Sequence, residues 1–462
     1  MLRITTLLDR ARERDEGVSI VEVLVAMTVF AMIAAGVAMG IASSLFLAHG
    51  SRSREVAINL AQDAVDSART SANLFSVVDG TTTPTVGGLR YTVKQTARWV
   101  PASGSANACG ATGVTGGPLA YKRISLTVSW ASAGKQSVSM NSLVAPTSSV
   151  TAANLGTIIV SASLVSGSGN AGAAVSIAPA VTNPGGAGAI TATIPKTDAN
   201  GCSYALNVKP GRYDVKLTEP DNIDDGTSSG SLGAQTATPS TTVTVQANQT
   251  SAANFNYDQA LTVVPQWSDP NASARPFTTP TSTTVSLRRK SADYGPYPTG
   301  VTTQVFPYTD GYKAVAGSPS TCLSVDPENW TPTSGTAVAP RNAPQPEAGT
   351  NAVKAPVQTL AVKLNGKLDN SLRAVSVAPD AGNGDPGCAT ATSYTFTNLP
   401  ANGTVTIALP YGTWSLQSGT VVSILPNLVN ITFSVTPPTV AAAAGVTPIA
   451  AGKVLLDPRR TP

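Results

Sequence analysis

One carboxylate interrupts the most apolar segment of the chain. Glu22 follows the residues GVSIV at 17–21, and residues 23–48 contain no charged side chain. Because a spanning helix needs about 20 apolar residues, we expect residues 23–48 to cross a membrane, and the run is too long for the apolar core of a secretory signal peptide. A carboxylate at bilayer depth costs roughly 2.5 kcal/mol or more. Glu22 therefore either lies at headgroup level or is met by a cation.

The residues on both sides of Glu22 resemble the signal of type IV prepilins and pseudopilins. A polar leader, MLRITTLLDRARERDEG, carries four arginines and four acids, ends in Gly17, and precedes an apolar segment with glutamate at its fifth position. The resemblance implies that a prepilin peptidase cleaves after Gly17 on the cytoplasmic side and that the new N-terminal amine, on Val18, is methylated. It also implies that Glu22 meets the N-terminal amine of a neighbouring filament subunit. A plain signal anchor is the alternative.

Four cysteines could form covalent cross-links. They are Cys109, Cys202, Cys322 and Cys388. None has C-x-x-C spacing, so we expect no zinc site, and outside the membrane disulfides are allowed. Four cysteines permit three connectivities. Cys202 and Cys388 each follow a glycine at similar positions of their segments, which favours separate partners over a bond between the two.

The chain offers few groups for catalysis. Its one histidine, His49, follows the apolar run directly, whereas a nucleophilic triad or a histidine-based metal centre needs a histidine elsewhere. We find no phosphate-binding glycine loop and no outstanding acidic pair. The net charge is only +4, without a basic cluster among aromatic residues, the usual sign of nucleic-acid binding. We therefore predict no enzyme activity, no metal or other cofactor, and no nucleic-acid partner.

The apolar segment continues into a pattern typical of a helix. Residues 51–70 contain no glycine or proline, and apolar residues recur on one face at helical spacing. The residues of this face are Leu60, Ala61, Ala64, Val65 and Ala68. The pattern predicts one helix from Val18 to about Thr70, roughly 80 Å long.

Alternating apolar and polar residues follow the predicted helix. They predict half-buried antiparallel strands at 90–100, 121–131 and 135–145. A helix that is half in the membrane and half on such a sheet is the pilin arrangement. By this resemblance residues 18–150 form a pilin-like α+β domain with its long N-terminal helix on an antiparallel sheet.

Three similar turns mark the rest of the chain. In KPGRYDVKL, PYTDGYKAVAG and LPYGTWSLQSG, a turn with glycine precedes an aromatic residue that starts an alternating strand. These aromatics, Tyr213, Tyr312 and Trp414, are 99 and 102 residues apart, a spacing of about one β-sandwich domain. The sequence therefore predicts tandem all-β sandwich modules. We expect them at 151–258, 259–332 and 357–456, with a Pro- and Ala-rich linker at 333–356.

Residues 197–217, TDANGCSYALNVKPGRYDVKL, resemble the prealbumin-like repeats of surface proteins, namely the collagen-adhesin B-type and carboxypeptidase-regulatory-like domains. The last module resembles them more loosely. Some B-type repeats form an isopeptide bond between a lysine and an asparagine of their first and last strands. Lys363 with Asn427 or Asn430 would be the candidates here, although exposed polar strand residues are the ordinary interpretation.

Together these patterns suggest a minor type IV pilin-like protein of a bacterial surface. Its expected partners are prepilin peptidase, other pilin subunits with their assembly machinery, the membrane, and a surface or glycan ligand. We expect a single membrane pass with the C-terminal domains outside, at the cell surface or in a pilus. Two alternatives remain: a pseudopilin of a secretion or DNA-uptake system, and a membrane-anchored surface β protein that never polymerises.

Overall fold

The computed structural model describes most of the chain beyond residue 18. The described residues are 19–71, 73–101, 109, 119–132, 134–145, 152–229, 234–270, 276–331, 337–338, 352–364, 369–400, 402–425, 428–433, 437–449 and 452–460. The chain divides into two compact units, Met1–Arg98 with Tyr121–Pro146 and Trp99–Ala120 with Thr147–Pro462.

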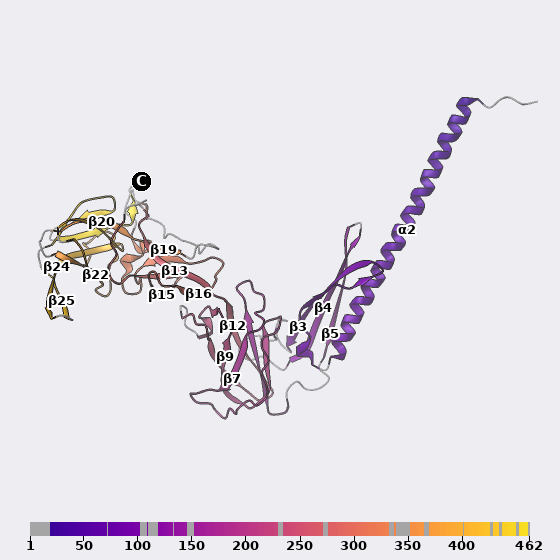
Figure 1. Ribbon diagram of the computed structural model, residues 1–462. Helices are drawn as coiled ribbons and strands as arrows, with labels where there is room; N and C mark the ends of the chain where they lie inside the picture. The colour runs from indigo at the N-terminus through magenta and orange to yellow at the C-terminus, as the bar shows by residue number, and fades with distance from the viewer. Residues whose placement is uncertain are drawn as a thin grey trace, which may run out of the picture. The chain divides into compact units, whose positions relative to one another are not determined.

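A long helix, α2 (Ile20–Thr70), begins the described part of the first unit (Figure 1). Its 51 residues correspond to roughly 75 Å. No proline interrupts the helix, and the Ser19 hydroxyl accepts a hydrogen bond from the Val21 amide as the N-cap. The prediction of one long N-terminal helix that ends near Thr70 is confirmed.

The two halves of α2 differ in burial. Residues 19–49 are all exposed. In the second half one face is buried, at the helical spacing that the sequence predicts. The buried residues are Ala57, Ala61, Val65 and Ala68. At the end of the helix the Arg69 guanidinium donates to the Ser142 hydroxyl of a neighbouring strand at 3.1 Å, so this half is held against the protein.

Five strands form the sheet of the first unit. They are β1 (Gly80–Thr82), β2 (Thr85–Val86), β3 (Leu89–Pro101), β4 (Leu119–Ser132) and β5 (Gly134–Val144). Their order is β1-β3-β4-β5, with β2 paired to β3, and strands lie at all three predicted positions. Alternate residues of β4 are buried, as the pattern predicts. These residues are Ile124, Leu126, Val128 and Trp130.

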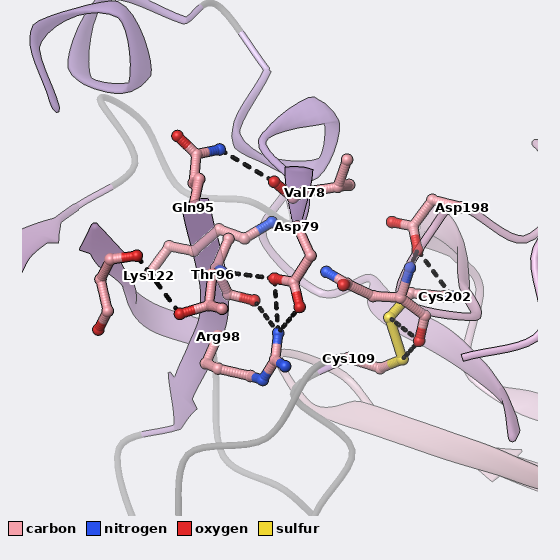
Figure 2. A network of polar contacts seen from close by, with 12 residues as sticks. Val78, Asp79, Gln95, Thr96, Arg98, Cys109, Lys122, Asp198 and Cys202 are labelled. Carbon is pink, nitrogen blue, oxygen red and sulfur yellow. Dashed lines mark hydrogen bonds and ion pairs between the residues drawn. A yellow bond between two sulfur atoms is a disulfide. The ribbon is translucent and has the colours of Figure 1, made fainter. Parts of the chain in front are cut away.

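The segment between α2 and the sheet is held by polar side chains. It contains a short 3-10 helix, Leu74–Ser76. The Asp79 carboxylate faces Arg98 of β3 (Figure 2) and accepts from the Arg98 guanidinium at 2.7 and 2.8 Å and from the Ala97 amide at 2.7 Å. The buried Lys122 ammonium donates to the Leu74 carbonyl at 2.7 Å. These contacts fix the connection from the helix to the strands.

Removal of the Asp79 carboxylate is expected to loosen this connection. Asp79→Ala removes the acceptor of the Ala97 amide and leaves the Arg98 guanidinium with its bond to the Ala97 carbonyl at 3.0 Å, and a hydrogen bond to a charged group contributes about 1.5–3 kcal/mol. Chemical denaturation should show a loss of that size, and hydrogen exchange at Ala97 should accelerate. Asp66→Ala is the matched control, because the exposed Asp66–Arg69 pair is 3.5 Å long and should contribute less than about 1 kcal/mol. Equal effects of the two substitutions would contradict this assignment.

Residues 156–259 form the first β module, which has its own core. Its strands are β6 (Gly156–Ser163), β7 (Ala174–Pro179), β8 (Cys202–Val208), β9 (Gly211–Thr218), β10 (Asn222–Asp224), β11 (Ser240–Val245) and β12 (Thr250–Gln259). They form two sheets, β10-β12-β6-β8 and β11-β9-β7. The core includes Ile158, Val160, Tyr213, Phe255 and Tyr257, none of them more than 2% exposed.

Residues 261–460 form a second β structure, which we call the C-terminal β region. Its longer strands are β13 (Leu261–Ser268), β14 (Thr284–Arg289), β15 (Ala292–Pro298), β17 (Lys313–Ala316), β19 (Ala352–Pro356), β20 (Gln358–Leu364), β21 (Asp369–Ser376), β22 (Ser393–Phe396), β23 (Gly403–Leu409), β24 (Gly412–Leu425), β25 (Leu428–Phe433) and β28 (Lys453–Leu456). Its short strands are β16 (Thr303–Val305), β18 (Ala337–Val338), β26 (Thr439–Val440), β27 (Val446–Pro448) and β29 (Arg459–Arg460).

A shared core joins the two modules that the sequence predicts at 259–332 and 357–456. Trp267 of β13 contacts Tyr394 of β22, with ring centroids 5.5 Å apart, and Tyr394 contacts Trp414 of β24 at 5.4 Å. Strand β19 lies within the predicted linker and pairs in parallel with β13. Residues on both sides of the predicted boundary belong to one buried cluster. They include Val263, Val285, Leu287 and Tyr312 on one side and Leu360, Phe396, Ile407 and Trp414 on the other.

The boundary at 333–356 therefore differs from the expectation. Described residues 352–356 are a strand rather than a linker, residues 337–338 form β18, and the rest of that range lies outside the described residues. The physical reason is that the sheet β16-β13-β19 takes its third strand from beyond residue 332. Buried apolar residues of β13 to β17 belong to one cluster with those of β19 to β28.

Two of the three glycine-aromatic turns have the same local geometry. Gly211 and Gly412 adopt φ of 150° and 137°, values that L side chains rarely take. Two residues later the Tyr213 hydroxyl donates to the Lys209 carbonyl, and Trp414 Nε1 donates to the Pro410 carbonyl, each at 2.9 Å. Each aromatic is fully buried, so the similarity seen in the sequence reflects a repeated way of starting a strand.

Candidate functional site

The candidate site is the exposed apolar half of α2, residues 20–49, which includes Glu22 in its first turn. Large apolar side chains along this half are mostly solvent-exposed, from Ile20 at 80% to Leu47 at 74%. The helix has a mean hydropathy of 2.4 over its best 18-residue window, and none of that window is buried. A contiguous apolar surface of this size needs a covering medium or partner, and by length and composition the helix can cross a membrane.

Glu22 lies in the first turn of this helix. Its amide donates to the Ser19 carbonyl at 2.9 Å, and its side chain is exposed. A carboxylate in the first turn is favoured by the partial positive charge of the helix N-terminus. Glu22 is also the sole ionisable side chain between residues 19 and 48, so any cation that it meets comes from outside this segment.

Gly17 and Val18, the predicted cleavage site, lie outside the described residues. The helix begins at Ile20, two residues beyond Val18. Ser19, which the sequence analysis did not single out, is the N-cap of this helix. A serine directly before an apolar helical run is a helix-start signal, and it could have been identified from the sequence.

Two glycines leave a surface without side chains in the apolar half of α2. A Cβ atom added at Gly36 or Gly40 would meet nothing within 4 Å. This G-x-x-x-G pair leaves room for another helix to approach closely. The described part of the chain supplies no such helix at this position.

The four cysteines belong to a different part of the chain. Cys109, in the connection between β3 and β4, is bonded to Cys202 at the start of β8 (Figure 2), and Cys322 is bonded to Cys388 within the C-terminal β region. Cys202 and Cys388 thus have separate partners, and none of the four is near Glu22 in sequence. Within the described residues no group of three or more His, Cys, Asp or Glu side chains could hold a metal ion.

The structure also places the isopeptide candidates. Lys363 is exposed on β20 and pairs with Thr404 and Thr439 of the two neighbouring strands. Asn430 lies on β25, which pairs with β24 in a different sheet. Asn427 lies outside the described residues. The strand pairing therefore gives no support to a bond between Lys363 and Asn430.

Comparison with known families bears on the first turn of α2. Residues 12–38 match the family model of the prokaryotic N-terminal methylation motif. The chain carries an N-terminal methylation motif. The match includes Gly17, Val18 and Glu22 and continues into the apolar half of α2, so the motif and the exposed helix coincide.

Other comparisons add little. No curated protein matches the chain. Similar solved structures include the Bacillus anthracis TIE protein, with 10% sequence identity, 77% of this chain covered and 70% of that chain, and a TM-score of 0.19. A streptococcal ancillary pilin is similar with 12% identity, 50% of this chain covered and 74% of that chain, and a TM-score of 0.19. At these TM-scores we draw no conclusion from either likeness.

Proposed function

We propose that the protein is a minor type IV pilin-like surface protein. The observation that carries this proposal is the coincidence of the methylation motif at 12–38 with a helix whose apolar half is exposed and whose first turn holds Glu22. Prepilin peptidase removes residues 1–17, the amine of Val18 becomes the N-terminus and is methylated, and assembly machinery transfers the subunit from the membrane into a filament.

On this proposal Glu22 acts by charge. Inside a filament the apolar halves of several helices cover one another, and a lone carboxylate there would be costly. Val18 precedes Glu22 by four residues, which is roughly 6 Å along a helix, so a neighbouring subunit displaced axially by about that distance brings its N-terminal amine level with Glu22. The resulting ion pair fixes the axial register of one subunit against the next, and mispaired registers leave both charges without a partner.

The rest of the first unit supports a pilin-like assignment. The buried face of α2 and the contact between Arg69 and Ser142 are what a helix packed on the antiparallel sheet requires. The β structures beyond residue 155 would then stand outside the cell as an adhesive or spacing head. The resemblance of residues 197–217 to prealbumin-like repeats of surface proteins fits that role. We propose a surface or glycan as the ligand and no catalytic role for the head.

Two other functions use the same helix. A pseudopilin of a secretion or DNA-uptake system would share the processing and the role of Glu22 but not a long surface filament. A surface β protein that is only anchored would need the apolar half of α2 but neither cleavage after Gly17 nor Glu22. The presence of the Glu22 carboxylate inside a matched methylation motif favours the pilin-like protein and the pseudopilin, both of which are cleaved, over the anchored surface protein.

Processing is the first test. Co-expression with a prepilin peptidase should give a mature chain that starts at Val18, and Gly17→Ala should slow or stop the cut, because the larger side chain sits at the scissile bond. N-terminal sequencing of the purified chain measures both. Gly50→Ala is the matched control, since a Cβ there meets nothing within 4 Å, and it should be processed normally. An intact leader on the wild-type chain, or a cut near residue 50, would sink the proposal.

A further inference from the structure

The first and last strands of the first β module are direct neighbours and run parallel. Strand β6 begins the module and β12 ends it, and they pair at seven positions, from Thr157 opposite Thr250 to Ser163 opposite Asn256. The Asn248 amide also donates to the Leu155 carbonyl at 2.7 Å, which extends the seam toward the start of β6. The chain therefore enters at one end of this seam and leaves at the other.

This arrangement determines how tension acts on the module. A pull between residues 155 and 260 draws β6 and β12 past each other along their length. All hydrogen bonds of the seam then bear the load together and must break in one step. If both strands were pulled from the same end, the bonds would break one pair at a time, which needs much less force.

Side chains reinforce the seam. Ile158 and Val160 of β6 and Phe255 and Tyr257 of β12 are buried in one core, so sliding of the strands would also expose apolar surface. The Tyr257 hydroxyl donates to the Ala237 carbonyl at 2.7 Å. Its backbone carbonyl accepts from Asn170 Nδ2 at 2.8 Å. Strand β12 is thereby held to the loop that follows β6 and to the segment that precedes β11.

The disulfide gives tension a second entry into the sheet that contains this seam. Cys202, bonded to Cys109, lies on β8 opposite Ser161 of β6. The sheet order is β10-β12-β6-β8, so tension that arrives through the disulfide enters on the β6 side. Load that enters at residue 155 crosses from β6 to β12 along their length before it leaves at Gln259. Cys202 faces Ser161, near the end of β6 that lies level with the end of β12, so load that enters through the disulfide does not shear the seam, and the proposal concerns load that enters at residue 155.

We propose that the first β module is a force-bearing element, in which the parallel β6–β12 seam resists tension between the membrane-proximal and C-terminal parts of the chain. The origin of that tension, between a filament and a bound surface, rests on the proposed function. The mechanical resistance itself depends only on the strand arrangement. The module would transmit load without lengthening, whereas a module with antiparallel terminal strands would unzip.

Single-molecule force spectroscopy on the full chain in lipid nanodiscs tests this. Handles are attached through unnatural amino acids, so that both disulfides stay intact. One protein carries handles at Ala153 and Gln259, which load the seam in shear. The matched protein carries them at Ala153 and Ala247, which pull both strands from the same end. All three positions are exposed, so the substitutions should not disturb the fold.

The expected result is a several-fold higher unfolding force for the 153–259 pair than for the 153–247 pair at the same loading rate. Similar forces in the two directions, or a lower force in the shear direction, would overturn the proposal. Circular dichroism and proteolysis of both handle proteins, compared with wild type, check that each is folded before it is pulled. An uncleaved leader would refute the proposed function and leave this mechanical result standing.

Discussion

Trp414→Ala is expected to unfold strands on both sides of residue 340. Trp414 is fully buried, and removal of a buried tryptophan side chain costs about 3–5 kcal/mol, a large fraction of the stability of an ordinary domain. Because Trp414 reaches Trp267 through Tyr394, β13 and β14 should lose protection together with β20 to β24. Hydrogen exchange measured by mass spectrometry on the full chain resolves these segments.

Tyr213→Ala is the matched control for Trp414→Ala. Tyr213 has the same turn geometry but belongs to the separate core of the first β module. It should remove protection from β6 to β12 and leave the C-terminal β region protected. A Trp414→Ala protein that keeps β13 and β14 fully protected while β20 to β24 exchange would show two independent modules, as the aromatic spacing predicted, and would contradict the shared core.

Glu22→Leu is expected to abolish recovery in filaments while leaving membrane insertion intact or improved. Membrane insertion becomes more favourable because a costly polar group is removed from the membrane segment. Filament assembly becomes less favourable because the N-terminal amine of the neighbouring subunit is left buried without its counter-charge. Breaking a buried ion pair costs about 3–5 kcal/mol. That cost corresponds to a loss of roughly 100-fold or more at each subunit contact. Immunoblots of sheared surface fractions and of membranes measure the two effects.

Glu22→Asp and Glu55→Leu distinguish the loss of the carboxylate at position 22 from the general effect of replacing an acid on this helix with leucine. Glu22→Asp keeps a carboxylate and should retain part of the assembly. Glu55 is an exposed acid on the same helix beyond the apolar half, and its replacement by leucine should leave assembly near the wild-type level. Wild-type recovery of Glu22→Leu in sheared filaments would rule out the ion pair and leave the anchor interpretation.

The N-terminal half of the fold could be predicted because local patterns determine it. An uninterrupted apolar run followed by a 3.6-residue periodicity is enough to specify α2, and the buried Ala61, Val65 and Ala68 are on the expected face. Strict alternation in β4 likewise placed Ile124 and Val128 inside. The motif around Gly17 and Glu22 was readable because its meaning depends on spacing along the chain rather than on contacts.

Long-range pairing could not be predicted in the same way. The spacing of Tyr213, Tyr312 and Trp414 indicates that similar turns before strands recur along the chain. It does not indicate whether each turn belongs to a domain with a core of its own. The parallel pairing of β13 with β19 and the choice of partners for Cys109 and Cys322 depend on which strands meet after the chain has crossed many residues. Asp79 was missed because its role is set by Arg98 and the Ala97 amide, which no local pattern connects to it.

The mass of the N-terminal peptide in the sheared surface fraction of producing cells tests the central claim most directly. Mass spectrometry of that fraction should find a peptide that begins at Val18 and carries one added methyl group, and it should find no peptide from residues 1–17. The same peptide should be absent from the sheared fraction of cells without prepilin peptidase. If the chain occurs only in the membrane fraction with its leader attached, it is an anchored surface protein and the pilin-like function is contradicted.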